Sequence, residues 1–194
     1  MRIQSATFEI SAPDLESCPP VVMPECAFIG RSNVGKSSLL NMLTGKKDLA
    51  KVSATPGHTK LINFFIINKK WRLVDLPGYG YSKVLKEKRD YFHDVIANYI
   101  SGREGLSCVF VIIDSSIPPQ QIDLQFVQWL VQCRLPFALV FNKTDKGKQS
   151  VVTRNIALFE AEIAAWTSAK PRIFPVSAKT GSGAGALVEC MQKL

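Results

Sequence analysis

A glycine-bearing loop between an apolar run and an amphipathic segment constrains the fold of this chain more than any other feature. The run CAFIG (26–30) has the composition of a buried strand, and KSSLLNMLTG (36–45) carries leucines at helical spacing. Between them, GRSNVGKS (30–37) satisfies the pattern G-x-x-x-x-G-K-[ST]. In such loops, backbone N–H groups and a helix N-terminus face phosphate oxygens. The sequence therefore predicts a strand, a phosphate-binding loop and a helix in succession.

Strand-like and helix-like segments alternate through the rest of the chain. Short apolar runs occupy 61–67, 71–76, 108–114, 136–142 and 172–176, and most are separated by segments with helical periodicity. Continuous apolar runs of this kind imply strands that are buried on both faces of a mainly parallel sheet. We expect a three-layer α/β fold in which helices cover both faces of a mostly parallel, six-stranded sheet.

The first 25 residues fit this alternation poorly. TFEIS (7–11) has the composition of an edge strand, and SAPDLESCPP (11–20) that of an extended connector held by proline. With 194 residues, the chain is long enough for one ordinary hydrophobic core. We predict an N-terminal extension (1–25) that packs on a single nucleotide-binding domain (26–194).

Two further motifs follow the ends of predicted strands, DLPG at 75–78 and NKTD at 142–145. At the carboxyl edge of a parallel sheet, Asp75 would hold Mg²⁺ through a water and Gly78 would offer its N–H to a γ-phosphate. Asp145 would accept two hydrogen bonds from guanine, one from N1–H and one from the exocyclic amine. Adenine does not present these two donors in that arrangement. Together with the phosphate loop, these motifs predict a site for GTP or GDP with Mg²⁺.

Several longer strings resemble one protein family. SAPD (11–14), FIGRSNVGKSSLLNMLTG (28–45), TPGHTKLINFF (55–65) and DLPGYGYSKV (75–84) are similar to the EngB (YihA/YsxC) family of ribosome-biogenesis GTP-binding proteins, among the TrmE-Era-EngA-EngB-septin-like GTPases. The resemblance implies a Ras-like P-loop GTPase fold, Mg²⁺-dependent GTP hydrolysis, and roles in large ribosomal subunit assembly and in cell division or septation. It also implies that Thr59 ligates Mg²⁺ and senses the γ-phosphate, with Thr55 as the nearby competitor.

The predicted site residues lie in five segments around these motifs. The predicted nucleotide contacts are Gly30, Arg31, Ser32, Asn33, Val34, Gly35, Lys36 and Ser37; Gly57, His58, Thr59, Lys60 and Leu61; Asp75, Leu76, Pro77 and Gly78; Asn142, Lys143, Thr144 and Asp145; and Val176, Ser177, Ala178 and Lys179. The predicted Mg²⁺ ligands are Ser37, Thr59 and Asp75. The predicted catalytic residues are Lys36, Thr59, Gly78 and Asn33.

The chain departs from Ras-like enzymes directly after D-x-x-G, where a glutamine commonly orients the attacking water. Tyr79 stands there, so we expect slow unaided hydrolysis. Asn33 has two open interpretations: it binds a potassium ion near the developing charge, as related GTPases with asparagine at this place can, or it only shapes the loop.

The sequence says less about the binding partner of this protein than about its nucleotide. The net charge of +8 fits either an anionic partner such as nucleic acid or a basic solvated surface. The segment 79–92 interleaves Tyr79 and Tyr81 with four cations, which fits RNA contact or the start of a solvated amphipathic helix. The resemblance favours a large ribosomal subunit precursor or its rRNA. A small-molecule kinase and a binding module for division or membrane proteins are the alternative classes, and NKTD argues against the adenine nucleotide of a kinase.

Cysteine usage and hydropathy bear on localisation. The five cysteines are odd in number and show no C-x-x-C spacing, which favours reduced thiols over disulfides or zinc. The longest apolar run, CVFVII, is too short to cross a bilayer, and neither a secretory signal nor a prenylation box is evident. We expect a cytoplasmic monomer with no membrane anchor.

Overall fold

The computed structural model describes residues 3–47, 49, 61–79, 86–167 and 170–194, with the backbone alone for 86–93. The strands are β1 (Ala6–Ala12), β2 (Glu25–Gly30), β3 (Ile62–Ile67), β4 (Trp71–Asp75), β5 (Leu106–Asp114), β6 (Phe137–Asn142) and β7 (Arg172–Pro175). The helices are α1 (Lys36–Thr44), α2 (Lys86–Gly102), α3 (Gln121–Gln132), α4 (Gln149–Ala164) and α5 (Ala184–Gln192).

The described strands form one sheet in the order β1-β3-β4-β2-β5-β6-β7. The strands from β4 to β7 in this order pair in parallel, whereas β3 runs antiparallel to both of its neighbours. The predicted α/β class is confirmed, but the predicted count of six strands was wrong. The sheet has seven strands because β1 extends it at the edge, with Ala6 opposite Ile67 and Ala12 opposite Ile62.

A tight turn explains why β3 and β4 are antiparallel neighbours. Asn68 and Lys69 have φ of 51° and 56°, and the N–H of Lys70 donates to the carbonyl of Ile67 at 3.0 Å. Positive φ at both central residues is typical of the turns that match the twist of a hairpin. The side-chain oxygen of Asn68 also accepts bonds from the N–H groups of Gln4 and Ser5, which brings the start of β1 to this turn.

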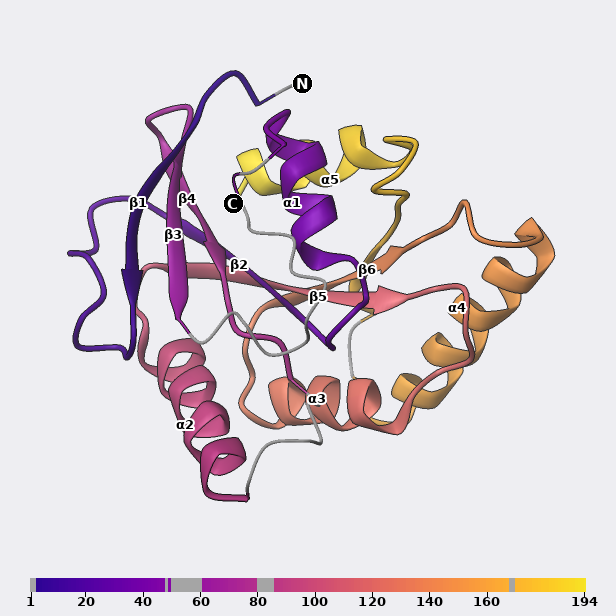
Figure 1. The fold of residues 1–194 in the computed structure, drawn as a ribbon. Coiled ribbons are helices and arrows are strands. Elements are labelled where there is room, and N and C mark those ends of the chain that lie inside the picture. The colour runs from indigo at the N-terminus through magenta and orange to yellow at the C-terminus, as the bar shows by residue number, and fades with distance from the viewer. Residues whose placement is uncertain (1–2, 48, 50–60, 80–85, 168–169) are drawn as a thin grey trace.

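Helices cover the sheet on both faces, α1 and α5 on one and α2, α3 and α4 on the other (Figure 1). Successive strand residues point to opposite faces, so Phe28 packs in the core under α1 and α5 while Ile29 packs in the core on the other side. The same alternation separates Val111 from Ile112 in β5. This double burial explains the continuous apolar runs of the parallel strands.

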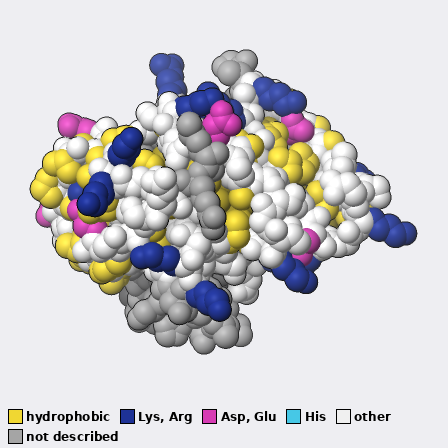
Figure 2. Space-filling view, turned by 90° about the horizontal axis from the view of Figure 1, so that it is seen from above, with side chains coloured by type: hydrophobic (Ala, Val, Ile, Leu, Met, Phe, Trp, Pro, Cys, Tyr) yellow, Lys and Arg dark blue, Asp and Glu magenta, His cyan; other side chains and the backbone are white. Residues whose placement is uncertain are grey.

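The face that carries α1 and α5 is seen from above in Figure 2. Lys and Arg side chains are dispersed over this view rather than gathered in one stripe, and apolar and acidic side chains lie between them. The net charge of +8 therefore does not produce a single continuous basic track on this side of the described surface. Among the described residues, no helix combines the length and the hydropathy that crossing a membrane requires.

Candidate functional site

The predicted phosphate loop joins the end of β2 to the start of α1. Asn33 and Gly35 have φ of 68° and 90°, and backbone of this kind turns successive N–H groups toward one side of a loop. A Cβ on Gly30 would lie 2.6 Å from the carbonyl oxygen of Ile112, and one on Gly35 would lie 2.6 Å from Nδ2 of Asn142. A side chain at either position would clash with its neighbours, so both glycines allow the loop to pack closely against β5 and Asn142.

Two charged residues of the predicted site meet directly beside this loop. The ammonium group of Lys36, in the first turn of α1, pairs with the carboxylate of Asp75 at the end of β4. Both side chains are buried, and Ser37 beside them is partly exposed. A cation is the kind of group that binds phosphate in proteins, and a carboxylate is the kind that binds Mg²⁺.

Gly78, the last residue of DLPG, lies against the phosphate loop. The N–H of Leu76 donates to the carbonyl of Phe28 at 3.0 Å, which ties the start of this segment to the end of β2. A Cβ on Gly78 would lie 3.0 Å from the carbonyl oxygen of Gly30 and 3.8 Å from Oγ of Ser32. The two motifs, more than 35 residues apart in the chain, therefore share one edge of the sheet.

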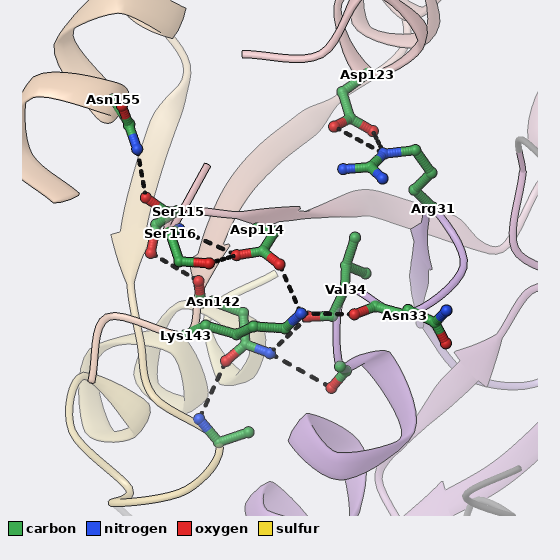
Figure 3. A network of polar contacts seen from close by, with 12 residues as sticks. Arg31, Asn33, Val34, Asp114, Ser115, Ser116, Asp123, Asn142, Lys143 and Asn155 are labelled. Atoms are coloured by element: carbon green, nitrogen blue, oxygen red, sulfur yellow. Dashed lines mark hydrogen bonds and ion pairs between the residues drawn. The ribbon is translucent and has the colours of Figure 1, made fainter. Parts of the chain in front are cut away.

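Asn142, the last residue of β6, connects three segments. Its Nδ2 donates to the carbonyls of Val34 at 2.9 Å and Gly35 at 3.4 Å, and its Oδ1 accepts from the N–H of Ala178 at 3.1 Å (Figure 3). The side chain is almost fully buried. Asn142 therefore holds the phosphate loop and the segment around Ala178 at set positions relative to NKTD.

Lys143 bridges the same loop from the other side. Its ammonium group donates to the carbonyl of Asn33 at 2.6 Å and to Oδ2 of Asp114 at 2.5 Å. Figure 3 shows the aliphatic part of the Lys143 side chain lying across the space between β5 and the phosphate loop. Burial of Asp114 opposes its ionisation, but the hydrogen bonds from Lys143 and Ser116 outweigh it and lower the pKa of that carboxyl.

Asp145 is exposed, and among the described residues its carboxylate accepts a hydrogen bond from one other side chain. The hydroxyl of Ser177 donates to its Oδ1 at 2.6 Å and lowers the pKa of Asp145 below its ordinary value. The N–H of Thr144 donates to the carbonyl of Val176 at 3.2 Å, so the two segments lie side by side. Lys179 is exposed next to them. An ionised carboxylate in this setting accepts hydrogen bonds from a ligand without first losing a proton.

Of the predicted site residues, four lie outside the described part of the chain, namely Gly57, His58, Thr59 and Lys60. The competitor Thr55 and the aromatic Tyr81 lie outside it as well. Leu61 is described and exposed just before β3, while Leu76 and Pro77 are buried. The rest of the predicted set converges on the edge of the sheet where β2, β4 and β6 end.

Tyr79 corrects one interpretation of the sequence. Its side chain is 4% exposed, and its hydroxyl donates to Asp123 at 2.9 Å. The hypothesis that Tyr79 stacks on RNA is therefore wrong for this structure, because a buried ring offers no face to a base. The side chains of the four cations that follow it lie outside the described residues.

Sequence reasoning missed Asp114 and Asp123. Asp114 could have been found, because it ends an apolar strand just as Asp75 and Asn142 do, and polar side chains at such ends collect at one edge of a parallel sheet. Asp123 carried no such signal. It lies in the first turn of α3, where an acidic residue is ordinary.

Comparison with known proteins decides the family. The family described as "50S ribosome-binding GTPase" matches residues 25–143. The chain is 46% identical to "Probable GTP-binding protein EngB" of Christiangramia forsetii, over 99% of this chain and 97% of that protein. The chain belongs to the EngB family of GTP-binding proteins. The relative of the same name in Bacteroides thetaiotaomicron is 45% identical, over 100% of this chain and 96% of that protein.

Solved structures agree with this membership. A crystal structure of a probable GTP-binding protein EngB superimposes with a TM-score of 0.66 at 29% identity, covering 87% of this chain and 97% of that chain. Era, solved with MgGDPNP and part of 16S ribosomal RNA, superimposes with a TM-score of 0.67 at 25% identity, covering 88% of this chain and 56% of that chain. The EngB family thus accounts for both the fold and the order of the motifs.

Proposed function

We propose that this EngB family member is a switch that binds and slowly hydrolyses GTP, acts in the assembly of the large ribosomal subunit, and is needed for normal cell division and septation. The observation that carries the proposal is the position of Asn142. This side chain binds both the phosphate loop and the segment of Ala178, beside the exposed carboxylate of Asp145. Asn142 would thereby fix the position of the phosphate-binding loop relative to the carboxylate that would accept hydrogen bonds from guanine.

Each segment has a distinct part in holding the nucleotide. The loop from Gly30 to Ser37 would enclose the phosphates, with Lys36 on the β- and γ-phosphates. Ser37 and Asp75, together with Thr59, would hold Mg²⁺, which would offset charge on the phosphate oxygens. The base would lie between the stem of Lys143 and the carboxylate of Asp145. Residues 26–194 would form this unit, with 1–25 as an extension packed on it.

Slow hydrolysis follows from the environment of Tyr79. A tyrosine hydroxyl that is already bound to Asp123 in a buried site does not orient an attacking water in place of glutamine. Asn33 has an exposed side chain, while its carbonyl is bound to Lys143. A potassium ion at Asn33 and a purely structural loop residue both fit this geometry. Faster hydrolysis in potassium than in sodium buffer supports the ion, and equal rates exclude it.

The guanine assignment is tested by exchanging the base acceptor. Asp145→Asn removes the charge that pairs with guanine, so GTP affinity falls by about 100-fold or more and xanthosine triphosphate becomes the better ligand. Titration calorimetry with both nucleotides measures the exchange. Asp14→Asn is the matched control, because Asp14 also accepts a hydrogen bond from a serine, the N–H of Ser17. Asp145→Asn with wild-type preference for GTP would refute the assignment.

The partner is tested by co-sedimentation with ribosomal particles. If loops on either side of the phosphate site change with the nucleotide, binding to precursors of the large subunit differs between GTP, GDP and a non-hydrolysable analogue. Gradients of cytoplasmic extract, supplied with each nucleotide in turn, measure this. Identical sedimentation in all three conditions contradicts the switch. In a separate binding measurement, ATP bound in place of GTP would indicate the kinase class.

A further inference from the structure

A buried contact centred on Asp123, a residue outside the predicted site, joins the phosphate loop to the segment after Gly78. Asp123 is fully buried, and both oxygens of its carboxylate lie 3.3 Å from Nε of Arg31. Figure 3 shows the Arg31 side chain reaching to Asp123, apart from the cluster of Asn33 and Lys143. The hydroxyl of Tyr79 donates to the same carboxylate at 2.9 Å. One carboxylate on α3 thus holds a residue of the phosphate loop and a residue of the segment that lies against this loop.

The ring of Tyr79 is held as well as its hydroxyl. It stacks on Phe126, with centroids 4.7 Å apart and planes inclined by 22°. Phe126 lies three residues after Asp123, so both contacts come from one face of α3. The backbone of Tyr79 also forms a bridge with Arg31. Tyr79 cannot leave this position without losing an aromatic stack and a hydrogen bond to a carboxylate.

These contacts restrain Gly78 from both sides. Two residues before it, the N–H of Leu76 is bound to the carbonyl of Phe28, and the residue after it is the buried Tyr79. A Cβ at position 78 would lie 3.0 Å from the carbonyl oxygen of Gly30. The two residues between these anchors, Pro77 and Gly78, have few alternative conformations. Gly78 therefore stays beside the phosphate loop in this structure.

We propose that Asp123 is a positioning residue for the nucleoside triphosphate. By holding Tyr79 and Arg31 together, it keeps Gly78 against the phosphate loop before the nucleotide arrives. A donor that is already in place stabilises its ligand more than one that must be ordered on binding. Gly78 would serve only the γ-phosphate, so the contact favours triphosphate over diphosphate. This inference rests on the proposed function, that is, on guanine nucleotide binding at this site.

The chain offers a matched pair of tyrosines for the test. Tyr79→Phe removes the hydroxyl and keeps a ring that can stack on Phe126. Tyr99→Phe is the control, because Tyr99 is also buried and its hydroxyl donates to a buried carboxylate, that of Glu25, at 2.8 Å. Glu25 begins β2, at the opposite end from the phosphate loop. Titration calorimetry gives the affinities for GDP and a non-hydrolysable GTP analogue, and urea unfolding gives the stability of each variant.

We expect Tyr79→Phe and Tyr99→Phe to lower the stability to a similar extent. Only Tyr79→Phe lowers the ratio of analogue affinity to GDP affinity, by about 10-fold, the effect expected for one hydrogen bond to a charged group. Asp123→Asn lowers the ratio too, and the double variant with Tyr79→Phe loses less than the product of the two single effects, because both act through one contact.

Among the single variants, an unchanged ratio in Tyr79→Phe, a raised ratio in Tyr79→Phe, or an equal fall in Tyr99→Phe would overturn the proposal. Multiplicative effects in the double variant would overturn it as well, since they would show that Tyr79 and Asp123 act separately. Failure of the proposed function looks different. In that case the wild-type chain itself binds neither GDP nor the analogue, whatever the variants do.

Discussion

At the scale of single residues, one buried amide organises most of the site. Asn142 uses both donors and its acceptor on backbone groups of two other segments. Each of those backbone groups would otherwise need another partner, because buried polar groups are costly when they are left unpaired. The close approach is possible only because Gly35 has no side chain facing Nδ2 of Asn142.

Gly35→Ala tests this close packing. The new Cβ would lie 2.6 Å from Nδ2 of Asn142 at a φ of 90°, so the amide or the loop must move. We expect GTP hydrolysis to fall by about 100-fold, since small displacements at a reacting centre have effects of this size. Hydrolysis assays at saturating GTP measure the loss.

Gly45→Ala separates the clash from the backbone strain. Gly45 also has a positive φ, of 66°, but a Cβ there would meet nothing within 4 Å. This variant should lose about 1 kcal/mol of stability from the left-handed backbone alone and keep its hydrolysis rate. If both glycine variants hydrolysed GTP at the same rate, the packing of Asn142 on the loop would not contribute to GTP hydrolysis.

At the scale of elements, a buried charge network attaches the N-terminal segment to the sheet. Glu25 is fully buried and accepts bonds from Arg72, Arg103 and Tyr99. Arg72 also binds Glu9 of β1, and the two arginines donate to the carbonyls of Pro20 and Pro19. The network therefore joins β1, β2, β4 and the connector that follows β1.

Glu25→Gln should destabilise the fold strongly. It removes the shared charge of two buried arginines, and breaking a buried ion pair on one side costs about 3–5 kcal/mol. Urea unfolding measures this, with Glu189→Gln as the control. Glu189 forms an exposed pair with Lys193 four residues later, so its neutralisation should change the stability by no more than about 0.5 kcal/mol. Equal stabilities of the two variants would show that the network contributes nothing.

At the scale of the whole molecule, the reactivity of the cysteine thiols shows how well the core excludes solvent and reagents. Burial raises the pKa of Cys108 to about 12 and that of Cys18 to about 11. The pKa of Cys26 is raised further for the same reason. The reactive form of a thiol is the thiolate, so these groups are protonated at neutral pH. Cys133, after α3, is the exposed cysteine.

Alkylation with iodoacetamide at pH 8 should therefore modify Cys133 first in the native protein. Modification of the three buried thiols, Cys26, Cys108 and Cys190, should require unfolding, because burial blocks access of the reagent to all three and also raises the pKa of Cys26 and Cys108. Peptide mapping after timed alkylation, in buffer and in urea, distinguishes the sites. Rapid native labelling of Cys26 would show that the core under α1 and α5 opens readily.

The comparison of sequence and structure depends on the range of each interaction. Strands and helices follow from local apolar periodicity, so their order was predictable, with bounds shifted by one to two residues at most of the ends. The edge strand β1 was left out of the count of six, although TFEIS alternates polar and apolar residues, because its partner strand lies about 55 positions away and no local pattern identifies it. The apolar residues of this alternation, Phe8 and Ile10, are exposed rather than buried in the core.

The motifs by themselves determined the phosphate loop, the edge of the sheet where the site lies and the family, because each works through backbone conformation and residues a few positions apart. Only the tertiary structure decided that Tyr79 is buried, that Asp123 joins the site and that Asp114 pairs with Lys143. Those contacts link side chains 29 to 92 residues apart in the chain. Such pairs depend on how helices pack on the sheet, and no local pattern of residue types encodes that geometry.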